Sequence, residues 1–276
     1  MNIPYITVFI LCVFLFTAVL YRFYLAFHSS RKSCETGACK TIGSREIQMD
    51  YYTTVENDNG MLAVVADGMG KDAGGRIAAK TVIRVFEELF GTYNMLDHPS
   101  YFFRKAFQTA NGEILKQMEE GKGRAAASAI MIQEGFLYYA IVGNVKVAVY
   151  RNQELVLLGT GHTVDVLAED KYYQGVLTRE DTLAMLHEKR IYNYLGKDGF
   201  HEIEFYDQPV RLKKDDIVAV FSNGLYESVA WKHIEDCLSQ KKSCNKIALE
   251  LTEAVNEKKG DKDNASIILV RIGELT

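Results

Sequence analysis

The sequence predicts an α+β fold built as a layered sandwich of antiparallel strands and helices. Strand-like segments fall into two blocks, and segments with apolar residues at helical spacing lie between and around them. The turns between neighbouring strand segments are too short for the crossover connection that parallel pairing requires. The strands are therefore expected to pair antiparallel rather than in a doubly wound parallel sheet.

The first strand block begins with a hairpin. Tyr51–Val55 and Met61–Ala66 are typical strands, joined by Glu-Asn-Asp-Asn-Gly, and the second ends at Asp67. Helices are expected over about 75–90 and 101–120. The sequence then predicts a four-strand antiparallel meander with strands at 126–133, 136–142, 146–150 and 155–158.

The second half of the chain mixes helices and strands. A charged helical interval over 163–190 precedes strands at 200–206 and 216–222. Two helices, at about 230–237 and 245–257, and a last strand at 265–272 complete the pattern. No internal repeat or long biased tract interrupts this order, which indicates one main domain.

The N-terminal segment is expected to anchor the chain in a membrane. Ile3–Tyr21 carries no charge and is long enough to cross a bilayer as a helix. A cleaved signal peptide is the alternative, but no Lys or Arg precedes the apolar run and no small-x-small site follows it. Basic residues after the run predict a single-pass protein of the cell membrane with its main domain in the cytoplasm. The expected organisation is an anchor over 1–28, a linker over 29–42 and one domain over 43–276.

Composition excludes one class of partner. The chain of 276 residues is 48% hydrophobic and 25% charged, which is typical of a globular protein, and its formal net charge is −4. It lacks the dense stripe of Lys and Arg that nucleic-acid binding needs. No nucleic-acid partner is expected.

A glycine-rich segment presents a carboxylate at the end of a strand. In Val64–Ala79, Asp67 ends a β-branched run and lies among four glycines, ahead of a helix-forming stretch. Glycine lets the backbone approach a ligand closely, so Asp67 and neighbouring carbonyl groups can converge on a metal ion. An ordinary strand-to-helix turn is the alternative explanation for this segment alone.

Three further acidic or amide positions lie beside predicted strands. Asp50 precedes the hairpin, Ser222-Asn223-Gly224 follows a strand, and Asp263-Asn264 precedes the last strand. Residues at strand ends can meet at one edge of a sandwich. Together with Asp67 they predict an all-oxygen site suited to Mg²⁺ or Mn²⁺.

From about Gly43 to Ile272, these motifs resemble the metal-dependent serine/threonine protein phosphatases of the 2C type. Arg45-x3-Met49-Asp50 stands where that family has an Arg followed by an acidic pair, and Ala66–Gly70 matches its DGMGG motif. Five more matches follow in order: Ala140–Lys146 to A-N-V-G-D-S-R, His162-Thr163 to D-H-S, Leu195-Gly196 to A-L-G, Phe221–Leu225 to S-D-G-L and Asp263–Ser266 to D-N-x-T. The resemblance implies a four-layer α-β-β-α sandwich of two antiparallel sheets flanked by helices.

The resemblance also implies roles for individual residues. Asp67 would bridge two divalent metal ions, Mg²⁺ or Mn²⁺, and the Gly68 carbonyl would bind one of them. Asp263 and the residue at Asn223 would ligate the second ion. Asp50 would hold metal-bound water, and Arg45 would bind the substrate phosphate. Phosphoserine and phosphothreonine would then be hydrolysed by water activated between the two metals.

Several positions depart from the family pattern. Asn223 and Asn144 replace Asp at the second-metal ligand and at the additional metal of bacterial members, and Met49 replaces an acidic neighbour. The lost negative charges weaken a site for stacked divalent cations. Two functions follow: an attenuated phosphatase, or a pseudophosphatase that binds phosphoproteins or regulates a partner at the membrane. A structural membrane-tethered scaffold is the third alternative.

The expected partners follow from the same resemblance. A phosphatase of this type acts on phosphoproteins, and bacterial relatives commonly oppose serine/threonine kinases. A cognate kinase or its targets are therefore expected partners. The interval 163–190 occupies the place of the family's variable flap and is expected to control access of the substrate.

Overall fold

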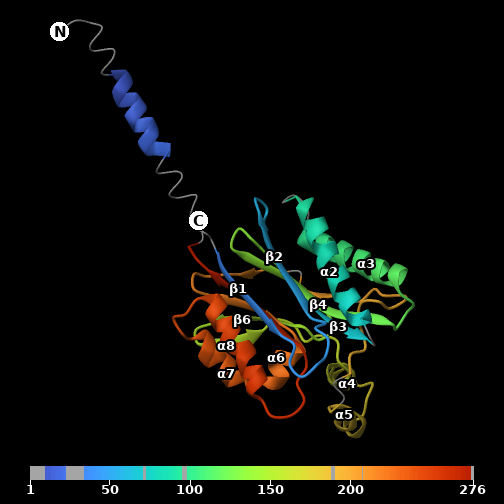
Figure 1. Ribbon diagram of the computed structural model, residues 1–276. Helices are drawn as coiled ribbons and strands as arrows, with labels where there is room; N and C mark the ends of the chain where they lie inside the picture. Colours follow the sequence, from blue (N-terminus) through green and yellow to red (C-terminus); the bar gives the residue numbers. More distant parts are fainter. Residues whose placement is uncertain are drawn as a thin grey trace, which may run out of the picture.

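Two antiparallel β-sheets lie face to face, and helices cover their outer faces (Figure 1). The computed structural model describes residues 10–22, 34–70, 73–94, 98–187, 190–206 and 208–274. The β1 sheet has the order β1 (Cys34–Thr41), β11 (Ala265–Ile272), β10 (Ile217–Phe221), β6 (Lys146–Arg151), β7 (Glu154–Leu157). The β3 sheet has the order β2 (Tyr51–Asn57), β3 (Gly60–Gly70), β4 (Gly123–Gln133), β5 (Phe136–Val142), β8 (Glu204–Phe205), and β9 (Val210–Arg211) also pairs with β5.

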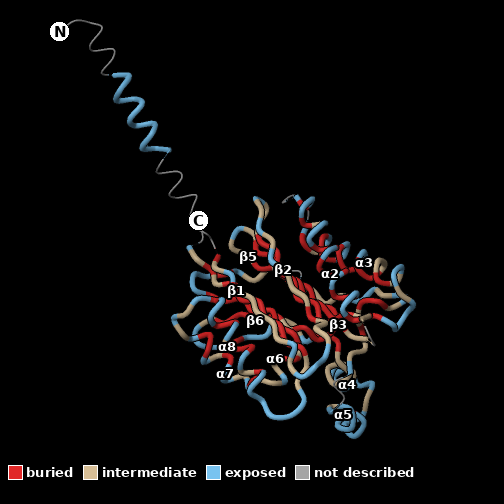
Figure 2. Tube along the Cα trace, viewed as in Figure 1, coloured by how far each residue is buried: buried red, intermediate tan, exposed pale blue. Residues whose placement is uncertain are grey.

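Three apolar cores separate four layers, as the resemblance implied. The strands at the centre are buried on both faces, so β3 is apolar along nearly its whole length (Figure 2). Its even-numbered residues 62–66 pack against the helices of the β3 sheet, and its odd-numbered residues 61–65 pack between the sheets. A third core lies between the β1 sheet and its own helices.

Each sheet has its own helical layer. The helices α2 (Gly74–Gly91) and α3 (Pro99–Gln117) cover the β3 sheet, where rings such as Phe86 and Phe107 pack edge to face with centroids 5.0 Å apart. The helices α6 (Asn223–Ser228), α7 (Trp231–Leu238) and α8 (Cys244–Glu257) cover the β1 sheet. Helices α4 (Val164–Tyr173) and α5 (Arg179–Met185) lie in the interval 163–190, and α5 is mostly exposed (Figure 2).

The predicted four-strand meander is wrong in one respect. All four strands are present, but β5 belongs to the β3 sheet and β6 to the β1 sheet. The chain crosses between the sheets at Gly143-Asn144, where Gly143 has a φ of +89° and donates its N–H to Nδ1 of buried His162. A short glycine turn looks the same in sequence whether it closes a hairpin or crosses between sheets.

The predicted linker over 29–42 is also wrong for residues 34–41, which form strand β1. Residues 29–33 lie outside the described residues. Strand β1 pairs with β11 along all eight of its residues. Its sequence, CETGACKT, lacks the apolar alternation that is typical of a strand. This polar sequence can still form a strand because its partner β11 is apolar and contributes much of the stability of the pair. At Gly37 a Cβ would lie 2.1 Å from the backbone of Cys244, so the strand approaches α8 more closely than a side chain permits.

The predicted strand at 200–206 is reduced to the two residues of β8. Its apolar residues Phe200, Ile203 and Phe205 instead pack against the core between the β3 sheet and its helices.

The predicted membrane span falls partly on described residues. Residues 10–22 are helical with exposed side chains, and residues 1–9 lie outside the described part of the chain. Among the described residues, no helix is both long and apolar enough to cross a membrane.

Candidate active site

A cleft of about 590 Å³ opens at the edge where β3 ends and β11 begins. Its wall includes five of the residues predicted from the sequence: Arg45, Asp67, Gly68, Asn223 and Asp263. They come from segments more than 200 residues apart in the chain, which the fold brings to one sheet edge. Lys71 and Asp72, which follow β3 in the sequence, lie outside the described residues.

Asp67 lies three residues before the end of β3. It pairs with Ala126 of β4, and its side chain is nine-tenths buried. At the next residue, Gly68, a Cβ would lie 2.2 Å from the Gly75 carbonyl oxygen and 2.8 Å from that of Met49. Glycine at 68 therefore lets the strand, α2 and the 49–50 segment meet closely around the Asp67 carboxylate.

Asp50 is fully buried and links the two sheets. It precedes β2 of the β3 sheet, but its Oδ2 accepts hydrogen bonds from Ser222 Oγ (2.6 Å) and Ser266 Oγ (2.8 Å) of the β1 sheet. Ser222 Oγ in turn accepts a hydrogen bond from the Ser266 backbone N–H (3.0 Å). Asp50 Oδ1 is buried and has no hydrogen-bond partner among the described residues.

The acidic residues of the site make one another's ionised forms less stable. Burial raises the pKa of Asp50 to about 6, although the hydrogen bonds from Ser222 and Ser266 act in the opposite direction. Burial also raises the pKa of Asp67 well above its usual value, and the nearby charges of Asp50 and Asp263 raise it further. Such a group of carboxylates favours a bound proton or a bound cation.

Arg45 and Asp263 form the outer side of the cleft. Arg45 Nε donates to Asp263 Oδ1 at 2.9 Å, and Nη1 lies 3.4 Å from Asp261 Oδ2. The Arg45 side chain is 47% exposed and that of Asp263 45% exposed. The predicted phosphate-binding residue therefore lies directly beside a predicted metal ligand.

The sequence reasoning predicted no individual role for Asn264, Ser222 and Ser266, although it named the motifs that contain them. The Met49 N–H donates to Asn264 Oδ1 (2.7 Å), and Asn264 Nδ2 donates to the Ile42 carbonyl (2.8 Å). Asn264 thereby holds the loop that carries Arg45 against the start of β11. All three residues lie within or beside the motifs at 221–225 and 263–266, which is the indication that could have found them.

The two amide positions differ in their surroundings. Asn223 begins α6 and lies on the cleft wall. Asn144 lies in the turn between β5 and β6 and does not line the cleft. Its Oδ1 is buried without a hydrogen-bond partner within the described residues, and its backbone carbonyl accepts a hydrogen bond from Tyr226.

The residues present fit a divalent cation. A buried, unpartnered oxygen on Asp50, mutually repelling carboxylates and an oxygen-only donor set are the features that Mg²⁺ and Mn²⁺ sites use. Within the described residues, no three His, Cys, Asp or Glu side chains are grouped to hold an ion by themselves. Backbone carbonyl groups, amides and water would therefore complete the coordination.

Comparison with known proteins agrees with this geometry. No protein-family model matches the chain. The serine/threonine phosphatase Stp of Listeria monocytogenes serovar 1/2a is 25% identical over 221 residues, covering 77% of this chain and 85% of that protein.

Two solved structures are similar over most of their length. The S. agalactiae serine/threonine phosphatase is 24% identical with a TM-score of 0.73, covering 87% of this chain and 99% of that chain. The catalytic domain of the serine/threonine phosphatase PstP, in complex with two manganese ions, is 20% identical with a TM-score of 0.69 at the same coverage. The chain thus has the fold of these phosphatases.

Proposed function

We propose that this protein is a metal-dependent protein phosphatase that hydrolyses phosphoserine and phosphothreonine. One observation carries the proposal: the buried carboxylate of Asp67, backed by Asp50, faces a cleft whose opposite side holds an exposed Arg45. The likeness to a serine/threonine phosphatase over 77% of the chain supports it.

In this proposal, Asp67, the Gly68 carbonyl, Asp263 and Asn223 supply oxygen ligands for two ions, Mg²⁺ or Mn²⁺. Such ions lower the pKa of water and neutralise the charge on phosphoryl oxygens. Asp50, fixed by two serine hydroxyl groups, offers its free Oδ1 as a hydrogen-bond acceptor for water. Burial raises the pKa of Asp50 to about 6 in the metal-free site, and bound cations would favour its ionised, proton-accepting form.

Arg45 binds the substrate phosphate in this proposal. Its guanidinium group is a planar fork of donors that matches phosphate geometry. Because its ion pairs with Asp263 and Asp261 are half exposed, they are weak enough to be exchanged for a dianionic phosphate.

The activity is attenuated because Asn223 brings an amide where a carboxylate would add a negative charge. An amide oxygen still ligates, but the cation is held less strongly. The enzyme therefore requires high metal concentrations, with Mn²⁺ favoured. Asn144 does not line the cleft, so an additional metal ion at that position would bind outside it.

The test is hydrolysis of a phosphothreonine peptide by the full-length chain while Mn²⁺ and Mg²⁺ are titrated. The expected result is turnover that EDTA abolishes, with Asn223→Asp lowering the Mn²⁺ concentration for half-maximal activity. Asn152→Asp, in the exposed turn between β6 and β7, is the matched control and leaves that concentration unchanged.

A pseudophosphatase is the second candidate function. It is favoured by the amides at 223 and 144 and by the ion pair that engages Arg45 and Asp263 with each other. If the folded protein shows no turnover at any metal concentration but binds the phosphopeptide, this second function replaces the first. Restored turnover in Asn223→Asp plus Asn144→Asp would identify the missing carboxylates as the cause.

We also propose that Ile3–Tyr21 anchors the protein in the cell membrane with the phosphatase domain in the cytoplasm, where a serine/threonine kinase or its targets are the partners. The support is the uncharged run and the basic residues that follow it. The test compares membrane fractions of cells that express the full chain or a chain lacking residues 1–28. Recovery of both proteins in the soluble fraction would contradict anchoring.

A further inference from the structure

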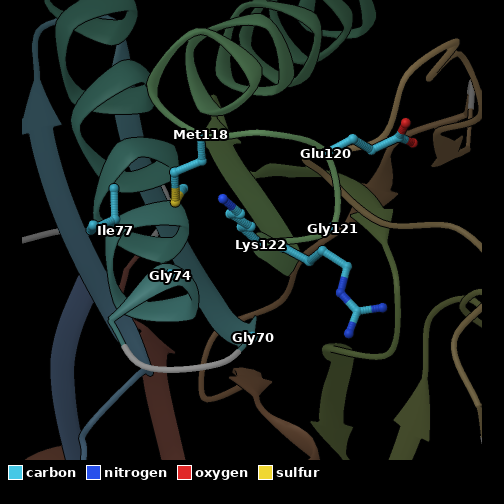
Figure 3. Close-up of a pocket in the computed structure, with 8 residues that line it drawn as sticks. Gly70, Gly74, Ile77, Met118, Glu120, Gly121 and Lys122 are labelled. Carbon is cyan, nitrogen blue, oxygen red and sulfur yellow. The ribbon is translucent and has the colours of Figure 1, made fainter.

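A second pocket adjoins the cleft at Gly70, and Figure 3 shows the residues that line this pocket. It has a volume of about 890 Å³ and is formed by the start of α2, the end of α3 and the start of β4. Gly70 lines both this pocket and the cleft that contains Asp67. A peptide with its phosphate in the cleft can therefore place a neighbouring residue in the pocket.

The register of β3 and β4 locates Arg124 relative to Asp67. Arg124 pairs with Met69, two residues beyond Asp67 on β3, which corresponds to about 7 Å along the strand. Residues that pair directly across antiparallel strands share a face of the sheet, so Arg124 lies on the same face as Asp67. About 7 Å also equals two residues of an extended peptide.

Arg124 is an unpaired cation in the described part of the chain. It has no ion pair there, and its Nε is buried without a hydrogen-bond partner. Its guanidinium carbon lies 5.2 Å from the ring centroid of Tyr194, which orients the group. Arg has donors in a fixed fork and no acceptor, so the natural occupant is an anionic oxygen group.

The surroundings of Arg124 are also positive. Lys197 Nζ lies 5.9 Å from the same Tyr194 ring, and Lys122 lines the pocket. Lys122 pairs with Glu119, but both side chains are more than 60% exposed and the pair is weak. Glu120 points away from Gly70 and Gly74 in Figure 3, and its Oε1 accepts the Asp198 N–H.

The start of α2 adds to this field. Gly74, its first residue, lines the pocket, and the helix has no side-chain cap and no acidic residue in its first turn. The 18-residue helix therefore directs the positive end of its dipole toward this region.

We propose that the Arg124 pocket binds an anionic side chain of the substrate, a carboxylate or a second phosphate, two to three residues from the phosphate that is removed. This inference rests on the proposed phosphatase function and names its substrate class: phosphopeptides with acidic or doubly phosphorylated sequences. Free inorganic phosphate has the same chemistry and is the competing occupant.

The test measures kcat/KM of the full-length chain for paired phosphothreonine peptides with Glu or Gln two and three residues to either side. The wild type is expected to prefer the best Glu peptide about tenfold, the size of one charge-assisted hydrogen bond. Arg124→Gln brings this ratio close to 1, and Arg124→Lys retains part of it. Lys122→Gln, at an exposed position, lowers the ratio by a smaller factor.

Arg104→Gln is the matched control. Arg104 on α3 also lies over an aromatic ring, 5.2 Å from the centroid of Phe205, but it lines neither pocket. This variant is expected to keep the tenfold ratio. Equal kcat/KM for the Glu and Gln peptides in the wild type overturns the proposal.

Inhibition by inorganic phosphate separates the two occupants. If Arg124→Gln keeps the peptide ratio but loses phosphate inhibition, the pocket holds free phosphate and the proposal is wrong. If no peptide is turned over, the phosphatase function fails, and fluorescence anisotropy of the same peptides decides on the pocket. Arg124-dependent tighter binding of the Glu peptide supports it, and equal affinities overturn it.

Discussion

The inner and outer sides of the cleft hold their charges in different ways. On the inner side, Asp50 and Asp67 are buried, repel each other's charge and are fixed by hydroxyl groups and close backbone contacts. On the outer side, Arg45 and Asp263 are about half exposed and neutralise each other. Without a cation, ionised carboxylates on the inner side therefore have a high free energy, whereas the charged groups on the outer side are solvated. The inner side determines what the site must bind, and the outer side can exchange partners.

Replacing the central inner carboxylate is expected to have the largest effect. Asp67→Asn should lower metal-dependent kcat/KM at least about a thousandfold, because the ligand that the proposal places between the two ions loses its charge. The same change should stabilise the protein in EDTA, since it removes one of the repelling buried carboxylates. Peptide hydrolysis and urea unfolding measure the two effects. If Asp67→Asn lowered both activity and stability, the buried carboxylates of the inner side would not be repelling each other as proposed.

Titration of Asp50, on the inner side, should make the free energy of unfolding depend on pH. The folded-state pKa of Asp50 is about 6, above its ordinary value, so between pH 4 and 6 the folded state keeps a proton that the unfolded state has lost. The stabilisation is complete below about pH 4 and is lost as the pH rises through 6, which amounts to roughly 3 kcal/mol. Wild type should lose this amount relative to Asp50→Asn between pH 4 and 7 in EDTA. Unfolding in urea at each pH measures it, and parallel pH profiles would refute it.

Removing a hydroxyl group behind Asp50 is expected to have a smaller effect. Ser222→Ala deletes a donor to Asp50 Oδ2 and an acceptor for the Ser266 N–H, and should destabilise the protein by about 1–3 kcal/mol at pH 7. The exposed Ser239→Ala, which loses a hydroxyl hydrogen bond to the Asp236 carbonyl and a side-chain contact with Tyr150, is the control and should change stability by less than about 0.5 kcal/mol. Equal effects of the two variants in urea unfolding would mean that the hydrogen bonds to Asp50 contribute no more to stability than an exposed hydroxyl group does.

The smallest effect on stability is expected on the outer side. Arg45→Gln should change the free energy of unfolding by less than about 1 kcal/mol, because its ion pairs are half exposed. KM for the phosphopeptide should nevertheless rise, because Arg45 is proposed to bind the phosphate. Steady-state kinetics and urea unfolding on the same preparation test both statements, and an unchanged KM would contradict this role.

The sequence predicted which residues meet at the cleft better than it predicted their contacts. Asp67, Asp263 and Asn223 could be found because each lies in a short motif beside a strand, and strand ends meet at sheet edges. The hydroxyl groups that hold Asp50 could not be assigned, because that contact joins residues 172 and 216 positions apart. Its existence depends on how the two sheets face each other.

The fold was predictable where local patterns suffice. The helices were identified by the periodic spacing of their buried residues, and the central strand β3 by its continuous apolar run. The crossing at Gly143 and the strand β1 were missed for a common reason. A glycine turn and a polar eight-residue segment take their structure from distant partners, His162 in one case and β11 in the other.

The pairing of β1 with β11 has a consequence for synthesis of the protein. Strand β1 cannot pair until the last described strand, β11, has been made, because β11 lies between β1 and β10 and begins two residues after Asp263. On the ribosome, the β3 sheet can pair with α2 and α3 early, whereas β1 and β10 stay without the strand that joins them until residues 265–272 emerge. The acidic cleft is therefore complete only after residues 263–272 have been synthesised, and a chain terminated before them carries no assembled site.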